Sequence, residues 1–133
     1  MTQTYNSDFM VSDSASTAFA MYSGVKTTGY TMGYDNTIDY MKLGSVENAT
    51  EVTTILDWAQ DAGKKTGFVT NTRMGHATPG ALYAKTVSRF WECENDWKKD
   101  IEDGKVTEED INKFKVGYKL TLLNSTPLIL SVA

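Results

Sequence analysis

The sequence of 133 residues contains a single cysteine, Cys93, and a single histidine, His76. Because a disulfide needs two cysteines, an internal disulfide is excluded, and so is a zinc site built from cysteines. No run of about 18 apolar residues is present, so no segment is expected to span a membrane. The net charge is −4 without a long basic run. Nucleic acid is therefore not expected as the main partner, because binding to its phosphates requires clustered Lys and Arg.

The composition fits one globular domain, residues 1–133. Hydrophobic residues make up 41% of the chain, which is ordinary for a folded protein, so disorder is not expected. Residues 1–10 are polar and lack the apolar core of a signal peptide. Taken literally, and if Met1 is the true start, this predicts a cytosolic protein.

The first half of the chain alternates helix and strand signals. Apolar residues recur at helical spacing over 14–26, and a second helix is expected from a cap at Asn48 or Thr50 to a terminating Gly63. Residues 66–71 are apolar and β-prone and predict a short, buried strand. This order of helix, glycine and strand indicates an α/β fold with a mostly parallel sheet.

The second half is less regular. Pro79 can open a third helix whose apolar face runs to Phe90, and residues 98–110 alternate Lys with Asp and Glu, as a solvated helix or loop does. Residues 117–133 are apolar and β-prone. One clear strand does not complete a sheet, so either the sheet is incomplete or its partner strands lie outside the chain.

Asp13 and Ser14 stand at the predicted start of the first helix. A hydroxyl at a helix N-terminus faces free N–H groups and the positive end of the helix dipole, where an alkoxide or a bound phosphate is stabilised. The alternative is that one of these polar residues only caps the helix, since Ser and Asp are preferred there.

His76, Thr78 and Arg89 are the other candidates. His76 could complete a serine–histidine–acid triad with Ser14, or it is a surface histidine with one hydrogen bond. Thr78 could offer a hydroxyl oxygen to Mg²⁺, or cap the helix that Pro79 opens. Arg89, expected on the polar side of that helix, could hold a phosphate with two parallel hydrogen bonds, or it is solvated. The acidic residues at 94–110 show no metal-binding spacing.

Together these motifs resemble the metal-dependent alkaline phosphatases, in their animal-type branch. The segment 13–18, Asp-Ser-Ala-Ser-Thr-Ala, resembles the nucleophile motif of that family, with Ser16 where a glycine or another small residue is usual. Segments 23–26 and 63–73 and the residues 76–79, His-Ala-Thr-Pro, continue the match in the same order, followed by Arg89. The resemblance is strongest over 9–97, and the tail 98–133 diverges.

The resemblance implies a portion of a three-layer α/β fold and the hydrolysis of phosphate monoesters through a phosphoserine. Ser14 would be the nucleophile and would touch zinc, Asp13 would accompany it, and Arg89 would hold the phosphate. Thr78 would bind Mg²⁺, with His76 near that metal. The family uses two Zn²⁺ ions and one Mg²⁺. Its members form homodimers and are extracellular or attached to the cell surface through a lipid anchor.

Departures from the family pattern concern the metals. No segment before Ser14 resembles the strand that carries the first metal-binding acid of the family, and no histidine other than His76 could serve as a zinc ligand. We therefore expect a partial phosphatase chain that is inactive alone. Two other interpretations stay open: a non-catalytic domain that binds phosphate or a protein partner, and a small serine hydrolase, although no Gly-x-Ser-x-Gly motif supports the latter.

Overall fold

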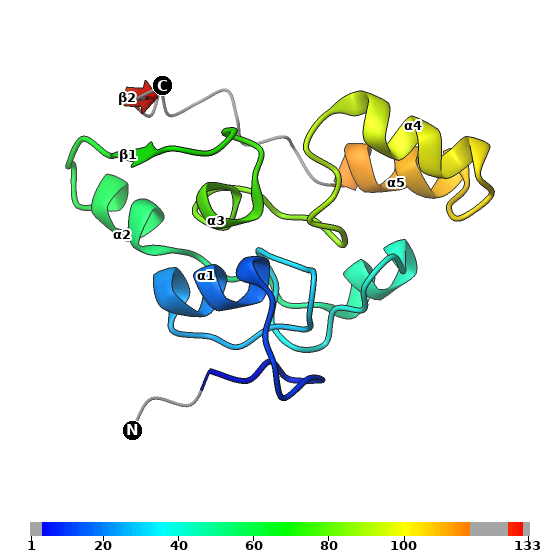
Figure 1. The fold of residues 1–133 in the computed structure, drawn as a ribbon, viewed down its shortest axis with the longest axis horizontal. Coiled ribbons are helices and arrows are strands. Elements are labelled where there is room, and N and C mark those ends of the chain that lie inside the picture. The colour runs from blue at the N-terminus through cyan, green and yellow to red at the C-terminus, as the bar shows by residue number, and fades with distance from the viewer. Residues whose placement is uncertain (1–3, 118–127, 132–133) are drawn as a thin grey trace.

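A computed structural model of the chain describes residues 4–117 and 128–131 (Figure 1). In chain order the elements are α1 (Ser14–Ser23), the 3-10 helix η1 (Leu43–Asn48), α2 (Ile55–Asp61), β1 (Gly67–Thr70), α3 (Ala77–Gly80), α4 (Glu94–Glu102), α5 (Glu108–Gly117) and β2 (Leu128–Ser131). In Figure 1, α3 lies between α1 and β1, and the α4–α5 pair stands to one side. Within the described residues no helix is long and apolar enough to cross a membrane.

The two short strands pair in parallel, with Gly67 opposite Leu128 and Thr70 opposite Ser131. The strand predicted at 66–71 is confirmed with slightly narrower bounds, but its predicted burial is wrong. Exposed and half-buried residues alternate along β1, and Val69 is 68% exposed. The expected mostly parallel sheet is thus represented, among the described residues, by this one pair, and helices and loops form most of the rest. Residues 118–127 of the predicted β-prone tail lie outside the described part.

Helix α1 confirms the helix predicted from Ser14. Asp13 is its N-cap, and its side chain accepts hydrogen bonds from the backbone amides of Ala15 and Ser16. Gly24 ends the helix in the left-handed conformation (φ 76°), which glycine adopts without a steric cost. The apolar face of α1 packs against α3 in a buried cluster that comprises Ala15, Ala18, Phe19, Met32, Ala77 and Ala81. This packing fixes the start of α1 relative to the loop before α3.

Helix α2 begins later than predicted. Its cap is Thr54, which forms a capping box with Asp57, and not Asn48 or Thr50. The residues before Thr54 are extended because their backbone is already paired: Glu51 bridges to Tyr34, and the amide of Val52 donates to the carbonyl of Gly33 at 3.0 Å. The predicted stop at Gly63 is confirmed by its φ of 71° and by the bonds of residues 63 and 64 back into the last turn.

The third predicted helix is wrong in its extent. Helix α3 ends at Gly80 instead of continuing to Phe90. Beyond a turn, Thr86 forms an antiparallel bridge with Met32, through two backbone hydrogen bonds of 3.0 and 3.2 Å. Those long-range bonds satisfy backbone groups that a longer helix would have used. The N-cap of α3 is His76, whose side chain accepts from the amide of Thr78, so the predicted cap role of Thr78 is also wrong.

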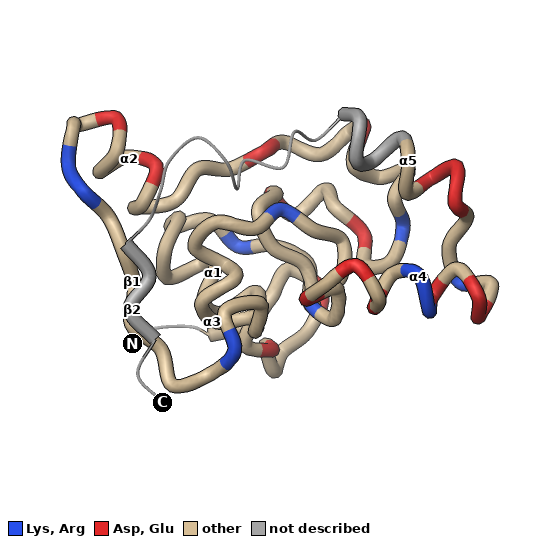
Figure 2. Tube along the Cα trace, turned by 90° about the horizontal axis from the view of Figure 1, so that it is seen from above, with Lys and Arg blue, Asp and Glu red and all other residues tan. Residues whose placement is uncertain are grey.

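A second buried cluster joins the loop after α1 to the α4–α5 pair. It comprises Tyr34, Ile38, Leu43, Val46, Val87, Val106 and Ile111. Helix α4 is a solvated helix, as the alternating charges predicted, and no residue of it is buried. Figure 2 shows charged residues of both signs along α4 and acidic residues at the start of α5, whereas α1 and α3 are mostly uncharged. The site described next lies at the start of α1, at α3 and at Arg89, which follows α3 in the chain.

Candidate functional site

Asp13 and Ser14 lie where the chain enters α1. Asp13 is the cap, so Ser14 occupies the first helical position and its hydroxyl is not needed to cap the helix. Of the two roles that the sequence left open, capping therefore falls to Asp13. The side chain of Ser14 is half-buried and is available for an interaction across the site.

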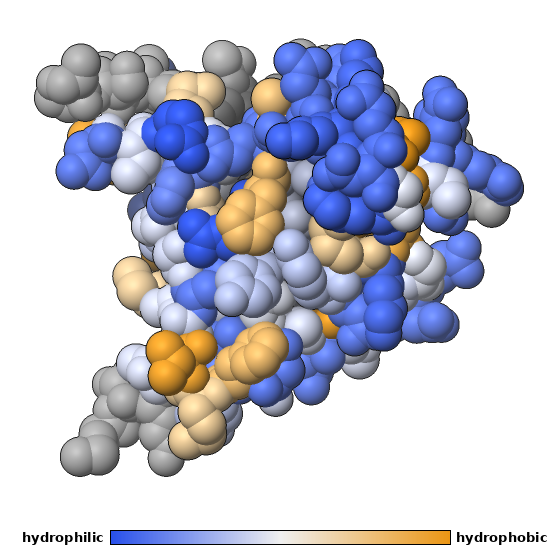
Figure 3. Space-filling view, turned by 45° about the vertical axis from the view of Figure 1, so that its right-hand side comes forward, coloured by the Kyte–Doolittle hydropathy of each residue, from blue (hydrophilic) through white to orange (hydrophobic). Residues whose placement is uncertain are grey.

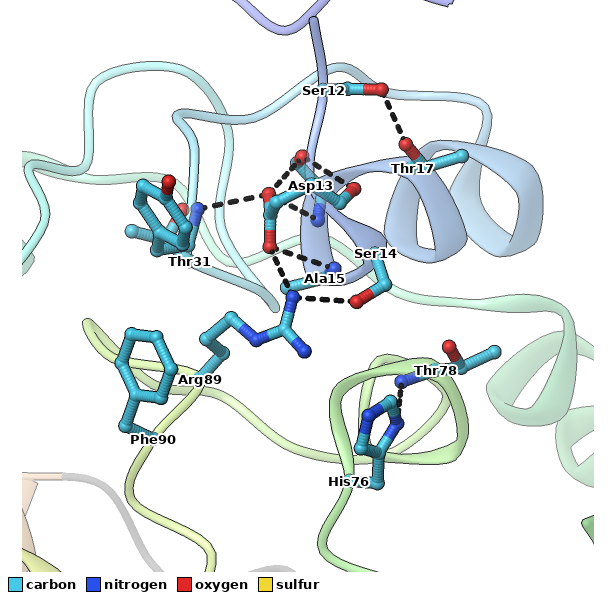
Figure 4. Close-up of polar contacts among 12 residues, drawn as sticks. Ser12, Asp13, Ser14, Ala15, Thr17, Thr31, His76, Thr78, Arg89 and Phe90 are labelled. Atoms are coloured by element: carbon cyan, nitrogen blue, oxygen red, sulfur yellow. Dashed lines mark hydrogen bonds and ion pairs between the residues drawn. The ribbon is translucent and has the colours of Figure 1, made fainter. Parts of the chain in front are cut away.

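Arg89 contacts both residues although it lies 75 positions after Ser14 in the chain (Figure 4). Its Nη1 donates to Ser14 Oγ at 2.5 Å and to Asp13 Oδ2 at 2.9 Å. The side chains are mostly buried, at 17% exposed for Arg89 and 11% for Asp13. Contrary to the sequence prediction, Arg89 is neither on a helix nor solvated. It follows the bridge between Thr86 and Met32, and its place depends on that tertiary contact.

The peptide groups of Tyr30 connect the two halves of this arrangement. The amide of Tyr30 donates to Asp13 Oδ1 at 3.1 Å, and its carbonyl accepts from the amide of Arg89 at 2.8 Å. Tyr30 adopts the left-handed conformation, with φ at 64°, which costs roughly 1–2 kcal/mol for a residue other than glycine. This backbone therefore positions the acid and the arginine at once.

The pKa of the Asp13 carboxylate is shifted downward by its surroundings. Burial alone would raise its pKa, but hydrogen bonds outweigh that effect and hold the pKa below its usual value. In order of size they come from the side chain of Ser16, the amides of Tyr30 and Ala15, and the side chain of Arg89. A negative charge is thus maintained beside the guanidinium, which keeps Arg89 oriented toward Ser14.

Ser16 is the residue that stabilises this carboxylate most directly. Its buried hydroxyl lies 2.6 Å from Asp13 Oδ1 and 2.6 Å from Oδ1 of Asn6, which is also buried. The hydroxyl oxygen lies within hydrogen-bond distance of both acceptors, so Ser16 joins the lead-in segment to the cap of α1. The sequence marked Ser16 only as an unusual residue in the motif and gave no sign of this role.

His76 and Thr78 lie on the neighbouring turn of α3. Figure 4 shows them across from Ser14 and Arg89. His76 Nδ1 accepts from the amide of Thr78 at 3.4 Å, and within the described residues no hydrogen bond joins His76 to Ser14. The arrangement does not form the serine–histidine pair of a hydrolase triad. Thr78 is an exposed residue, and its hydroxyl could offer one oxygen to a cation.

The donor set does not make a complete metal site. Among the described residues no three His, Cys, Asp or Glu side chains come together as metal ligands would. Ser14 and Thr78 can contribute hydroxyl oxygens only, and a structural or catalytic zinc site needs at least three protein ligands. The described residues therefore suit the binding of an anion such as phosphate, but they do not provide a set of metal ligands.

The structure thus brings three of the five predicted residues into direct contact, Asp13, Ser14 and Arg89. The other two, His76 and Thr78, are on the adjacent turn. The family profile described as "Alkaline phosphatase" matches residues 1–122. The chain belongs to the alkaline phosphatase family.

Relatives in this family include animal and bacterial enzymes. Alkaline phosphatase of Gadus morhua is 45% identical over 108 residues, which cover 78% of this chain and 22% of that protein. The chain therefore spans about a fifth of the length of that relative. The structure of alkaline phosphatase from the Antarctic bacterium TAB5 matches with a TM-score of 0.56 and 32% identity over 68% of this chain and 23% of that one.

Solved structures also identify the fold. The cold-active alkaline phosphatase of a psychrophilic Shewanella species matches 99% of this chain and 35% of its own, with a TM-score of 0.58 and 25% identity. The chain accordingly adopts a portion of the alkaline phosphatase fold. A mutant of the TAB5 enzyme is described with magnesium bound.

Proposed function

We propose that this alkaline phosphatase chain supplies the nucleophile and the phosphate clamp for hydrolysis of phosphate monoesters. The observation that supports this most is the single nitrogen Nη1 of Arg89, which donates to both Ser14 Oγ and Asp13 Oδ2. A hydroxyl, a guanidinium and a helix N-terminus are thereby directed at one place. This combination suits an anion with several oxygens. The whole fold, with its three layers and parallel sheet, would be completed by the rest of an alkaline phosphatase.

In the proposed reaction Ser14 Oγ attacks phosphorus. The bond from Oγ to phosphorus forms as the bond from phosphorus to the leaving oxygen breaks. The leaving group departs with that electron pair and takes up, directly or through water, the proton that the Ser14 hydroxyl loses. Water then attacks the phosphoserine and releases inorganic phosphate and the serine hydroxyl. Arg89 would hold the non-bridging oxygens in both steps, because the charge on these oxygens must be neutralised in the transition state.

Metal ions would be held partly by this chain. Thr78 would offer its hydroxyl to Mg²⁺ with His76 nearby, and Ser14 Oγ would touch Zn²⁺. When bound, such ions lower the pKa of a coordinated hydroxyl and stabilise a leaving group. A serine hydroxyl without that help is a weak nucleophile. Since the described residues lack a set of zinc ligands, we expect the 133-residue chain alone to be inactive toward monoesters.

A chimera tests the proposal directly. Residues 9–97 would replace the matching segment of the Gadus morhua enzyme, and hydrolysis of p-nitrophenyl phosphate would be measured with zinc and magnesium. We expect an active chimera whose activity is abolished by Ser14→Ala and strongly reduced by Arg89→Ala. Labelled phosphate should be trapped on Ser14 at acidic pH. The chain alone, assayed in parallel, should not exceed its Ser14→Ala variant.

Other outcomes would point elsewhere. A chimera that folds and binds metal but hydrolyses nothing would contradict the catalytic role and favour a phosphate-binding domain. Activity that persists in the Ser14→Ala chimera would assign the nucleophile to another residue. Zinc-dependent turnover by the isolated chain would contradict the expectation that it is inactive.

A further inference from the structure

Four aromatic rings with exposed surface lie together on the described part of the chain: Phe9, Tyr30, Tyr40 and Phe90. Tyr30 is at the centre, with ring centroids 6.4 Å from Phe9, 5.3 Å from Tyr40 and 6.1 Å from Phe90. Each of the four residues is at least 38% exposed, and Phe90 is 56% exposed. We refer to these four residues as the aromatic cluster. Figure 3 shows a face of the molecule on which hydrophobic side chains form patches among hydrophilic ones.

The aromatic cluster borders the phosphate clamp. Tyr30 holds the clamp through its backbone, since its amide donates to Asp13 and its carbonyl accepts from the amide of Arg89. Phe90 follows Arg89 in the chain, and the guanidinium carbon of Arg89 lies 5.7 Å from the Phe90 ring centroid. Figure 4 shows the Phe90 ring beside the Arg89 side chain. A phosphate on Arg89 would therefore have aromatic surface next to it.

The backbone of Tyr30 adds a second observation. Its φ of 64° is in the left-handed region, where glycine would be accommodated without strain. The hydrogen bonds of Tyr30 to Asp13 and Arg89 use backbone groups, which any residue provides. What tyrosine adds at this position is its ring, and that ring is exposed beside the site. Strained backbone of this kind is concentrated at functional sites.

We propose that the aromatic cluster binds the leaving group of an aryl phosphate, with the phosphate on Arg89 and the aromatic part against Tyr30 and Phe90. This rests on the proposed function and specifies its substrate class. Rings prefer offset-stacked or edge-on contacts with other rings, and the residues of the cluster are exposed enough to make such a contact. A cationic leaving group fits less well, because Arg89 stands beside Phe90 and the charge of Asp13 is already paired.

Binding measurements on the 133-residue chain test this without turnover. Isotope-labelled chain would be titrated with inorganic phosphate, methylphosphonate and phenylphosphonate, at a pH where both phosphonates are dianions. We expect phenylphosphonate to bind about 3- to 10-fold more tightly than methylphosphonate, the range that one aromatic contact provides. In Tyr30→Gly, which suits the left-handed backbone, the ratio of the two affinities should fall to about one. Tyr30→Phe should retain the preference.

A matched control and a second variant complete the test. Tyr5→Ala removes an exposed tyrosine outside the aromatic cluster and should leave the ratio unchanged. If Tyr30→Gly does not fold, Phe90→Ala provides the same comparison. Equal affinities for the two phosphonates, with inorganic phosphate bound, would overturn the inference and leave the proposed function standing. A preference that survives both variants would also overturn it. Failure to bind any of the three anions would overturn this inference, and the chimera would then decide the proposed function on its own.

Discussion

Replacing Asp13 tests whether the cap of α1 and the clamp on Arg89 are one structural unit. Asp13→Ala removes the cap, worth about 1 kcal/mol. It also removes the partner of a guanidinium that is 17% exposed, which costs about 1–3 kcal/mol when a charged group loses its hydrogen bond. The unfolding free energy should therefore fall by about 2–4 kcal/mol. Asp13→Asn keeps an oxygen that can cap, so its loss should be about 1–2 kcal/mol.

The pH dependence gives an independent measure of the same interaction. Because the pKa of Asp13 is lower in the folded chain than in the unfolded one, its ionised form stabilises folding. That contribution is complete above the unfolded pKa of about 3.9 and is lost as the pH falls through the lower folded pKa. The stability gap between the native chain and Asp13→Asn should thus narrow below about pH 4. Other acids with lowered pKa values, such as Glu92 and Asp100, contribute to both proteins.

Urea unfolding followed by tryptophan fluorescence measures these differences. Ser12→Ala is the matched control, because Ser12 is next to Asp13 and, within the described residues, its hydroxyl bonds only to Thr17 Oγ1, at 2.6 Å. It should cost no more than about 1 kcal/mol. If Asp13→Ala were no less stable than Ser12→Ala, or if the gap to Asp13→Asn stayed constant from pH 6 to pH 3, the coupling inferred here would be wrong.

Three further substitutions test the supports of the site by the same unfolding measurement. Ser16→Ala should cost about 1–2 kcal/mol, because its buried hydroxyl bonds two acceptors; an unchanged stability would contradict that network. Gly33→Ala should cost about 2–5 kcal/mol, since φ is 89° and a Cβ would lie 2.6 Å from Lys85 Cα. Gly63→Ala, at φ 71° with no atom within 4 Å, should cost only about 1–2 kcal/mol. Equal losses at the two glycines would refute the close packing at Gly33.

Sequence patterns predicted the parts of this fold that depend on local interactions. The start of α1, the stop at Gly63 and the strand after it follow from capping residues, a left-handed glycine and β-prone residues that act within a few positions. The prediction that the third helix extends to Phe90 was wrong because apolar spacing indicates which residues are buried and does not determine the backbone conformation. Val87 is buried, as its spacing suggested, but in a segment that pairs with residues far away in the sequence.

The candidate site likewise contains residues that the sequence reveals and one residue that only the tertiary structure reveals. Ser14, Asp13 and Arg89 were recognisable by residue type and by the resemblance to a family, and they do come together. Tyr30 was not recognisable, because it acts on Asp13 and Arg89 through its amide and carbonyl, which every residue possesses. Only the tertiary structure could reveal that its backbone bends into the left-handed region to reach both.

The arrangement around Arg89 predicts that phosphate binding and phosphate hydrolysis depend on different residues. Arg89 is oriented before any anion arrives, by Asp13 at its guanidinium and by Tyr30 at its amide. An arginine side chain can lose about 2 kcal/mol of rotamer entropy when it is fixed, and here much of that ordering belongs to folding. Nη1 is engaged by Ser14 and Asp13, and within the described residues Nε and Nη2 make no hydrogen bond. That free edge can hold two oxygens of one phosphate. Phosphate affinity should therefore depend on Arg89 and survive the loss of the Ser14 hydroxyl. Folding alone orients Arg89 for binding, whereas hydrolysis also requires the nucleophile Ser14.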